Sequence, residues 1–348
     1  MHDIQRRTRD ERSKWTYAWR LLRFLVVSSI YMARLQRRHQ YDLIHVHNVP
    51  DFLVFAAWIP KLMGAKLILD IHDIVPEFFA SKFSTKARNG YVRLLKSVEK
   101  ASMAFADHVI VSNHLWHEKL IARSVSREKS SVFLNHVDLA QFYRRRRTRH
   151  DDKFIIMFPG SFQWHQGLDI AIEAFARVKN EVPNAELHFY GGGSTKEDLV
   201  RLAKRLGLNG SVKFCGGVSH DEVAGVIANA DLGIVPKRAD SFGNEAYSTK
   251  IMEFMSQGVP VVVSRTKIDM FYFDDSVVKF FESGNADAMA DAMLQVIKDP
   301  AMRDALIAKG FEYVARHSWD QKRKEYLDLV DSLSTGSFGE PSPGEGAN

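Results

Sequence analysis

Cysteine and long hydrophobic runs are nearly absent from this chain of 348 residues. Its one cysteine, Cys215, excludes an internal disulfide framework and fits a reducing compartment, and within VKFCGG we expect a small buried strand residue. The most apolar early run, residues 21–32, is interrupted by Arg23 and is shorter than the about 20 residues that a bilayer requires. We therefore expect no spanning helix, no signal peptide and a cytoplasmic location.

Glycine is absent from the first 40 residues, which have the composition of a helix. Apolar and aromatic residues stand there among many arginines: Trp15, Tyr17, Trp19, Leu22, Phe24 and Leu25. Two interpretations remain open. The segment is either an amphipathic helix that lies peripherally on an acidic membrane, on its inner face, or an ordinary domain helix with a basic outer face.

The charges are divided unevenly along the chain. Residues 1–150 contain 27 Lys and Arg against 13 Asp and Glu, whereas residues 151–348 contain 21 against 29. The basic half favours an anionic surface as partner, but it contains no recognisable base-reading module, so we expect no nucleic-acid partner. A chain of this length that is 45% hydrophobic and 26% charged most simply forms two globular domains.

Four apolar segments that end in polar residues predict the strands of a first α/β domain, residues 1–143. They are YDLIHVHN from Tyr41, AKLILDIHD from Ala65, DHVIVSN from Asp107 and SSVFLNHVD from Ser130. Helical stretches between the first three indicate a doubly wound, Rossmann-like domain, whose ligand-facing edge lies where the strands end.

A charged segment, residues 144–153, follows and predicts a domain boundary. Four consecutive arginines from Arg144 could bind phosphate or lipid headgroups, but a solvated linker is the simpler interpretation. From Phe154 to residue 317, six strand segments alternate with helices and predict a second parallel sheet of Rossmann type: FIIMFPGS, ELHFYGGG, VKFCGG, DLGIVPK, VPVVVS and VVKFF. Residues 318–333 predict a final helix, and residues 334–348 have the small, polar composition of a disordered tail.

The most informative stretch is SFGNEAYSTKIMEFMSQGVPVVVS, residues 241–264. We expect a helix to begin near Ala246 and to end at Gly258, before a buried strand. Glu245 and Glu253 are separated by seven residues. They could bracket a phosphate that is held by the free backbone amides of Ala246 to Thr249 and by Lys250, or they could be ordinary solvated helix acids.

This stretch resembles the donor-site signature of the retaining GT-B glycosyltransferases of family 4. The resemblance extends over roughly residues 41–330, through GSFQWHQGLDIAIEAF, HFYGGG, VKFCGGVSHDEV and ADLGIVPK in family order. It implies two Rossmann-like domains with the last helix crossing back to the first domain. It also implies that Glu245 contacts the donor sugar, that Glu253 binds the ribose, and that the backbone of Tyr247, Ser248 and Thr249 with Lys250 holds the diphosphate.

The chain also departs from the family pattern. No strand with a Gly-rich turn precedes Tyr41, so the first domain is expected to be incomplete. Ser161 and Gln166 stand where the family usually has Arg and Lys. Lys237, Arg238 and Lys250 are then the candidates that could replace this charge, while Gly160, Gly191 and Gly192 would let the backbone approach the nucleotide.

Further candidates follow the first two strands. His45 and His47 share one strand face, and a structural or substrate-contacting pair is favoured over a metal pair because no third ligand is near in sequence. The resemblance places His72 close to the donor sugar, although a hydrogen-bonded core histidine is equally consistent with the residue alone. The acceptor-side candidates are His47, Asn48, Asp51 and Asp73.

The resulting hypothesis is a glycosyltransferase that moves a sugar from a nucleotide-diphosphate donor to a glycan or lipid-linked acceptor with retention. We expect no cofactor and no metal, because the chain contains no Asp-x-Asp, the pattern of metal-bridged donor sites. Glu245, His72 and Lys250 would be its catalytic residues. A sugar-nucleotide epimerase and a non-catalytic subunit of the same architecture remain as alternatives.

Overall fold

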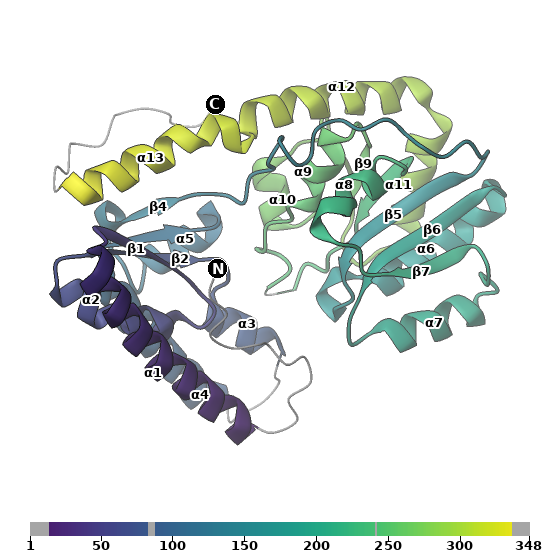
Figure 1. The fold of residues 1–348 in the computed structure, drawn as a ribbon. Helices are drawn as coiled ribbons and strands as arrows, with labels where there is room; N and C mark the ends of the chain where they lie inside the picture. The colour runs from purple at the N-terminus through teal and green to yellow at the C-terminus, as the bar shows by residue number, and fades with distance from the viewer. Residues whose placement is uncertain (1–13, 83–87, 241, 336–348) are drawn as a thin grey trace. The chain divides into compact units, whose positions relative to one another are not determined.

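The computed structural model describes residues 14–82, 88–240 and 242–335 (Figure 1). It divides into two compact units, Asn135–Arg323 (unit 2) and a unit formed by Met1–Leu134 with Lys324–Asn348 (unit 1). The division after Leu134 lies earlier than the boundary predicted at residue 143. Part of the predicted tail, residues 336–348, lies outside the described residues, as do the side chains of Trp15 and Tyr17.

Unit 1 contains a parallel sheet whose four strands follow one another in chain order. They are β1 (Leu43–His47), β2 (Lys66–Ile71), β3 (His108–Val111) and β4 (Ser130–Val132). All four coincide with predicted segments. Within the described residues the strand order follows the chain without a reversal. The physical reason is that residues 14–39, which precede β1, form a helix and add no strand beside it.

Helices surround this sheet. They are α1 (Lys14–His39), η1 (Asp51–Ala57), α2 (Trp58–Leu62), α3 (Val75–Lys82), α4 (Arg88–Phe105), α5 (His114–Ile121), η2 (Arg127–Lys129) and α13 (Trp319–Thr335). The purple helix α1 packs against η1 and α2 (Figure 1). Tyr326 and Leu333 of α13 pack with Ile68 and Ile110 of the sheet, so the C-terminal helix is part of the core of unit 1.

Unit 2 contains six parallel strands in the order β10-β9-β8-β5-β6-β7. They are β5 (Phe154–Ser161), β6 (Ala185–Gly192), β7 (Val212–Gly216), β8 (Leu232–Val235), β9 (Val261–Ser264) and β10 (Lys279–Phe281). Each corresponds to a predicted segment. The order starts in the middle, proceeds outward and then reverses, as in the dinucleotide-binding Rossmann fold, so a topological switch point lies between β5 and β8.

Helices cover both faces of the second sheet. They are η3 (Trp164–Gln166), α6 (Leu168–Glu181), α7 (Lys196–Arg205), α8 (His220–Ile227), α9 (Lys250–Ser256), α10 (Lys267–Tyr272), α11 (Ala286–Lys298) and α12 (Pro300–His317). Successive residues of β5 alternate between two cores: Ile156 and Phe158 pack with α6 and α11, whereas Ile155 and Met157 pack with α8 and α9. The strand is therefore apolar throughout because both of its faces are buried.

The charged segment, residues 144–153, is largely exposed but is held along unit 2 by several contacts. Arg147 and Arg149 both form ion pairs with Asp231, the former at 2.6 Å, and the backbone amide of Thr148 donates to Asn229 at 2.9 Å. Composition alone does not show that these arginines have acidic and carbonyl partners on a neighbouring element.

Cys215 is exposed, which corrects the expectation of a buried strand residue. It lies on β7, which is the edge strand of the sheet, so one side of it remains accessible. In the part of the chain that the structure describes, no helix combines the length and the apolar character needed to cross a bilayer.

Candidate functional site

The site in unit 2 is built at the carboxyl ends of β5, β6 and β8, where the strand order reverses. Gly160 and Gly191 lie side by side at the ends of β5 and β6, and both have positive φ angles, 151° and 138°. A Cβ on Gly191 would overlap the carbonyl oxygen of Gly160. Ser161 and Gly192 complete the two strand ends and are exposed, and nothing lies within 4 Å of the position of a Cβ on Gly192. Because Gly160, Gly191 and Gly192 have no side chains, a ligand can approach the backbone closely at this edge.

Lys250, the first residue of α9, reaches this edge. A Cβ on Gly160 would lie 2.5 Å from Cε and 3.3 Å from Nζ of Lys250, so the absence of a side chain at residue 160 makes room for the ammonium. The ammonium lies 5.3 Å from the ring centroid of Phe158. Burial lowers the pKa of Lys250, and the nearby Glu253 raises it in part. Among the described residues the ammonium has no hydrogen-bond or ion-pair partner.

The loop that precedes α9 has unused hydrogen-bond donors. We expected the helix to begin near Ala246, but it begins at Lys250, because the amide of Ala246 already donates to Phe242 at 2.9 Å in a separate turn. The amides of Tyr247, Ser248 and Thr249 have no acceptor within the described part of the chain. The hydroxyl of Ser248 is buried and has no partner there either. These donors lie next to Lys250 and suit an anion.

Lys237 anchors this loop from within and does not extend toward a ligand. Its ammonium donates to the carbonyl oxygen of Ala246 at 2.7 Å and pairs with Asp269 at 2.8 and 3.1 Å. Lys237 is only 2% exposed, and Asp269 is fixed in turn by the hydroxyl of Thr266 at 2.6 Å. The ammonium is fully occupied, which corrects the expectation that Lys237 would contact phosphate.

Arg238 is likewise held by protein groups. Its guanidinium forms an ion pair with Asp169, donates to the carbonyl oxygen of Trp164 at 3.2 Å and lies 4.6 Å from the ring centroid of that residue. Arg238 therefore fixes η3 to the start of α6. Tyr247 is also structural in its side chain, because its hydroxyl donates to the sulfur of Met252 at 3.1 Å and its ring packs on Tyr272.

The two glutamates differ in their surroundings. Glu245 is buried at the end of the turn that begins at Phe242. Glu253 is half-buried on the first turn of α9, and within the described residues no side chain or amide binds its carboxylate. A half-buried carboxylate without a protein partner is unusual, since burial of a charge is unfavourable unless it is paired or hydrogen-bonded. Glu253 is thus available to ligand hydroxyls.

Sequence reasoning missed His165, which lies on η3 directly before Gln166. Burial lowers the pKa of His165, as do the charges of Lys250 and Lys237, whereas the charge of Asp240 raises it in part. Its ring meets the edge of Phe242 at 5.5 Å between centroids. The side-chain oxygen of Gln166 is buried without a partner among the described residues. One signal in the sequence could have pointed to His165. It stands beside Gln166, the position before Gly167 at which the family usually has a Lys.

A second group of polar residues lies at the carboxyl ends of β1 and β2 in unit 1. His47 and Asp70 are paired in register, and His45 and His72 lie two residues away on their respective chains, so all four share one face. Oδ2 of Asp70 lies 3.2 Å from Nε2 of His45, 3.1 Å from Nδ1 of His47 and 3.2 Å from Nε2 of His72. The Asp70 carboxylate raises the pKa of His72, whereas burial lowers the pKa of His47.

The remaining acceptor-side candidates join the loops after these two strands. The amide group of Asn48 donates to Asp51 at 2.9 Å and to the carbonyl oxygen of Asp73 at 2.7 Å, while its oxygen accepts from the amide of His72 at 2.8 Å. Burial raises the pKa of Asp73, and it raises the pKa of Asp51 to about 6. Asn48 and Asp51 thus position His72, and His47 is the most exposed of the group.

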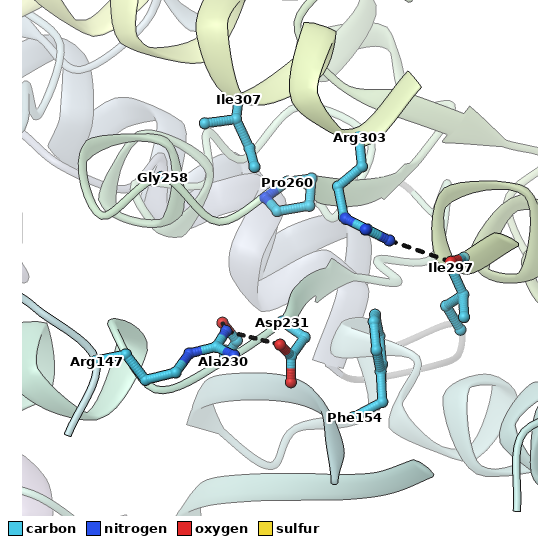
Figure 2. A pocket seen from close by; sticks show the side chains of 9 residues that line it. All are labelled: Arg147, Phe154, Ala230, Asp231, Gly258, Pro260, Ile297, Arg303 and Ile307. Carbon is cyan, nitrogen blue, oxygen red and sulfur yellow. Dashed lines mark hydrogen bonds and ion pairs between the residues drawn. The ribbon is translucent and has the colours of Figure 1, made fainter. Parts of the chain in front are cut away.

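The cavity in Figure 2 lies elsewhere. It has a volume of about 510 Å³, and Phe154, Asp231 and Pro260 among its lining residues stand at the amino ends of β5, β8 and β9. Arg147 points toward Asp231 and Arg303 toward Ile297, so both guanidinium groups have partners. Parallel sheets bind ligands at the carboxyl ends of their strands, so we assign this cavity no part in the site.

The raised pKa of Asp51 gives a pH-dependent stability. An ordinary aspartate has a pKa near 3.8, so the folded chain binds this proton more tightly than the unfolded chain, and stability falls as pH rises from about 4 through 6. Asp51→Asn should remove this loss and raise the unfolding free energy by up to about 3 kcal/mol at pH 7.5 but not at pH 4. Urea unfolding at both pH values measures this change in unfolding free energy, and Asp42→Asn, at an exposed residue, is the control. An equal effect of Asp51→Asn at both pH values would contradict the assignment.

Comparisons with known proteins identify the family. The family model described as "Glycosyl transferases group 1" matches residues 140–313, and that described as "Glycosyltransferase Family 4" matches residues 3–141. An uncharacterized glycosyltransferase of Methanocaldococcus jannaschii is 24% identical over 327 residues, which cover 80% of this chain and 81% of the relative. The lipopolysaccharide core biosynthesis glycosyltransferase LpsE of Rhizobium meliloti is 29% identical over 183 residues, 52% of this chain and 51% of the relative.

Solved structures agree on the fold. Sucrose-phosphate synthase from Thermosynechococcus elongatus has a TM-score of 0.75 at 21% identity, covering 95% of this chain and 82% of that one. Anabaena HepE in complex with UDP and glucose has a TM-score of 0.69 at 18% identity, covering 88% and 81%. The chain therefore belongs to the group 1 glycosyltransferases and has their two-sheet α/β architecture, the GT-B fold.

Proposed function

We propose that this glycosyltransferase transfers a sugar from a nucleoside-diphosphate donor to a glycan or lipid-linked acceptor, with retention of configuration and without a metal in its donor site. The observation that carries the proposal is the ammonium of Lys250, which lies against Gly160 and has no hydrogen-bond or ion-pair partner among the described residues, beside the amides of Tyr247, Ser248 and Thr249, which have no acceptor there. A departing nucleoside diphosphate develops negative charge, and preoriented amides with a buried cation stabilise such charge strongly.

Lys250 could also supply the positive charge that is missing at Ser161 and Gln166, where the family usually has Arg and Lys. Ser161 and Gln166 supply no charge, and Lys237 and Arg238 are occupied by Asp269 and Asp169. Of the cations that the sequence suggested, Lys250 is thus the one whose ammonium remains available to phosphate within the described residues. It is half-buried next to the glycine edge, where a phosphate would be partly shielded from water and the attraction would be stronger than in bulk water.

The other roles follow from position and chemistry. Glu253 would bind the ribose hydroxyls, because its carboxylate is half-buried and no described residue pairs with it. Glu245, which is buried beside the loop, would bind hydroxyls of the transferred sugar. In unit 1, His72 would act near the sugar, and His47, Asn48, Asp51 and Asp73 would form or support the acceptor side. The relative LpsE is a lipopolysaccharide core biosynthesis glycosyltransferase, and this similarity favours a glycan or lipid-linked acceptor in polysaccharide biosynthesis.

Substitution of Lys250 and Glu253 tests this proposal. Lys250→Met should lower kcat about 10²-fold to 10³-fold with no loss of thermal stability, because it removes leaving-group stabilisation together with an unfavourably buried charge. Glu253→Gln should mainly raise the donor KM. The measurement is release of nucleoside diphosphate from UDP-, GDP- and ADP-sugars by the purified chain with a lipid-linked glycan acceptor.

Matched controls exist on α12, where Lys309 and Glu312 have the same spacing and form an exposed pair at 2.9 Å. Lys309→Met and Glu312→Gln should leave both kinetic constants unchanged. Full activity of Lys250→Met would refute the donor site. Exchange of solvent deuterium into the donor sugar without acceptor would instead indicate an epimerase, and nucleotide binding without turnover would indicate a non-catalytic subunit.

A second proposal concerns location: α1 lies on an acidic membrane surface at the cytoplasmic face. Trp19, Leu22, Val26 and Ile30 follow one another at helical spacing and are all exposed, Trp19 to 67%. Leu62, 78% exposed on the adjoining α2, extends the apolar area. Arginines at several α1 positions and the excess of basic residues in the first 150 residues match anionic headgroups.

Vesicle sedimentation tests the location. The chain should pellet with vesicles of phosphatidylglycerol and phosphatidylcholine, and the bound fraction should fall at high salt and with phosphatidylcholine alone. Leu22→Ser with Val26→Ser should reduce binding at least fivefold. The control is Val200→Ser, which changes an exposed valine of α7 in unit 2. Equal binding by the double variant and the control would refute the assignment.

A further inference from the structure

The cluster of three histidines and one aspartate in unit 1 has a geometry that the proposed sugar transfer does not require. Four donor atoms converge: Nε2 of His45, Nδ1 of His47, Oδ2 of Asp70 and Nε2 of His72. The sequence alone favoured a role other than metal binding for His45 and His47, because no third ligand followed nearby. The fold supplies the missing ligands from β2 and from the residue that follows its end.

The separations between these atoms match those of a small coordination sphere. Ligands that lie about 2.0–2.1 Å from a tetrahedral ion are about 3.3 Å from one another. Three separations from Asp70 are 3.1–3.2 Å, and Nδ1 of His47 lies 2.9 Å from Nε2 of His72. The donor atoms of His45, His47 and Asp70 all lie within 4.8 Å of one another. Four of the six separations that such a site requires are therefore already near the expected value.

At least one ring nitrogen of the cluster carries no proton. Nδ1 of His47 and Nε2 of His72 face each other at 2.9 Å, and only one of them can carry the proton of that hydrogen bond. The accepting nitrogen has a lone pair, and both nitrogens lie within 3.2 Å of Oδ2 of Asp70. Imidazole nitrogens with one carboxylate are the ligand set that zinc, cobalt(II) and nickel(II) prefer.

The surroundings resemble an outer coordination shell. Nδ1 of His45 lies 2.8 Å from the hydroxyl of Tyr326 on α13, which can fix the ring so that Nε2 faces Asp70. The backbone amide of His72 donates to Asn48 at 2.8 Å, which fixes the position of that ligand as well. The side chain of His47 is 60% exposed, so an ion from solvent has access to the cluster.

We propose that His45, His47, Asp70 and His72 bind one divalent transition-metal ion of the zinc class with tetrahedral coordination. The ion would occupy Nε2 of His72, the nitrogen that the acceptor side would otherwise use. An ion on His72 would replace the role near the sugar that is proposed above for this residue. The tests of the donor site change Lys250 and Glu253 of unit 2, whereas the tests of the ion change His47 and Asp70 of unit 1, so their outcomes can be distinguished.

Cobalt titration tests the site. The untagged full chain, stripped with chelator, should bind one Co²⁺ and show the intense visible bands of tetrahedral cobalt, which one equivalent of Zn²⁺ should abolish. Asp70→Asn and His47→Gln should each raise the Kd for Co²⁺ at least tenfold and remove these bands. His47→Gln changes an exposed side chain, so it keeps the test valid if Asp70→Asn fails to fold.

The control is His188→Gln, which changes a histidine that is paired with Glu186 at 2.8 Å on β6. It should bind Co²⁺ as the unaltered chain does. Three results would overturn the proposal: no binding below millimolar Co²⁺, weak octahedral bands only, or an affinity that is the same in His47→Gln and the unaltered chain. None of these measurements depends on glycosyltransferase activity.

Discussion

The buried ion pair between Lys237 and Asp269 is the constraint on which the donor site depends. The Lys237 ammonium binds both oxygens of Asp269 and the carbonyl oxygen of Ala246, and all three acceptors lie 2.7–3.1 Å away. Because Ala246 is fixed through its carbonyl, the loop that follows is tied to Lys237, and within the described residues the amides of Tyr247, Ser248 and Thr249 have no acceptor. The Lys237 ammonium, which is bound by protein groups, thus positions the backbone amides that a ligand would contact.

Lys250 differs from Lys237 in that no described protein group pairs with its ammonium. Its ammonium is partly desolvated, it contacts the space left by Gly160, and its pKa is lowered because burial disfavours the charged form. A chain selected only for stability would place an apolar residue there. The unfavourable charge of Lys250 and the unpaired carboxylate of Glu253 lie three residues apart on one helix turn. They form a preorganised polar surface whose missing partners would be a diphosphate and a sugar hydroxyl.

The sequence predicted every strand of both sheets, because buried parallel strands are continuous apolar runs bounded by polar residues. It also named Gly160, Gly191 and Lys250 as candidates, and the fold brings these three residues together. It could not predict that α9 begins four residues after Ala246, because this depends on the separate turn in which the Ala246 amide donates to Phe242 and on Lys237, which holds the Ala246 carbonyl. The contacts of residues 144–153 with unit 2 could not be predicted from the sequence either. The same holds for the hydrogen bonds of His45 with Asp70 and Tyr326. Each depends on a partner that only the fold brings close.

Amide hydrogen exchange of the loop before α9 tests the central claim most directly. Amides without an acceptor exchange quickly, and a bound diphosphate would occupy them. With UDP, GDP and ADP added in turn, the nucleotide that binds should slow exchange at Tyr247, Ser248 and Thr249, and should do so less in Lys250→Met. Binding of a nucleotide that leaves exchange at these three residues unchanged would contradict the account.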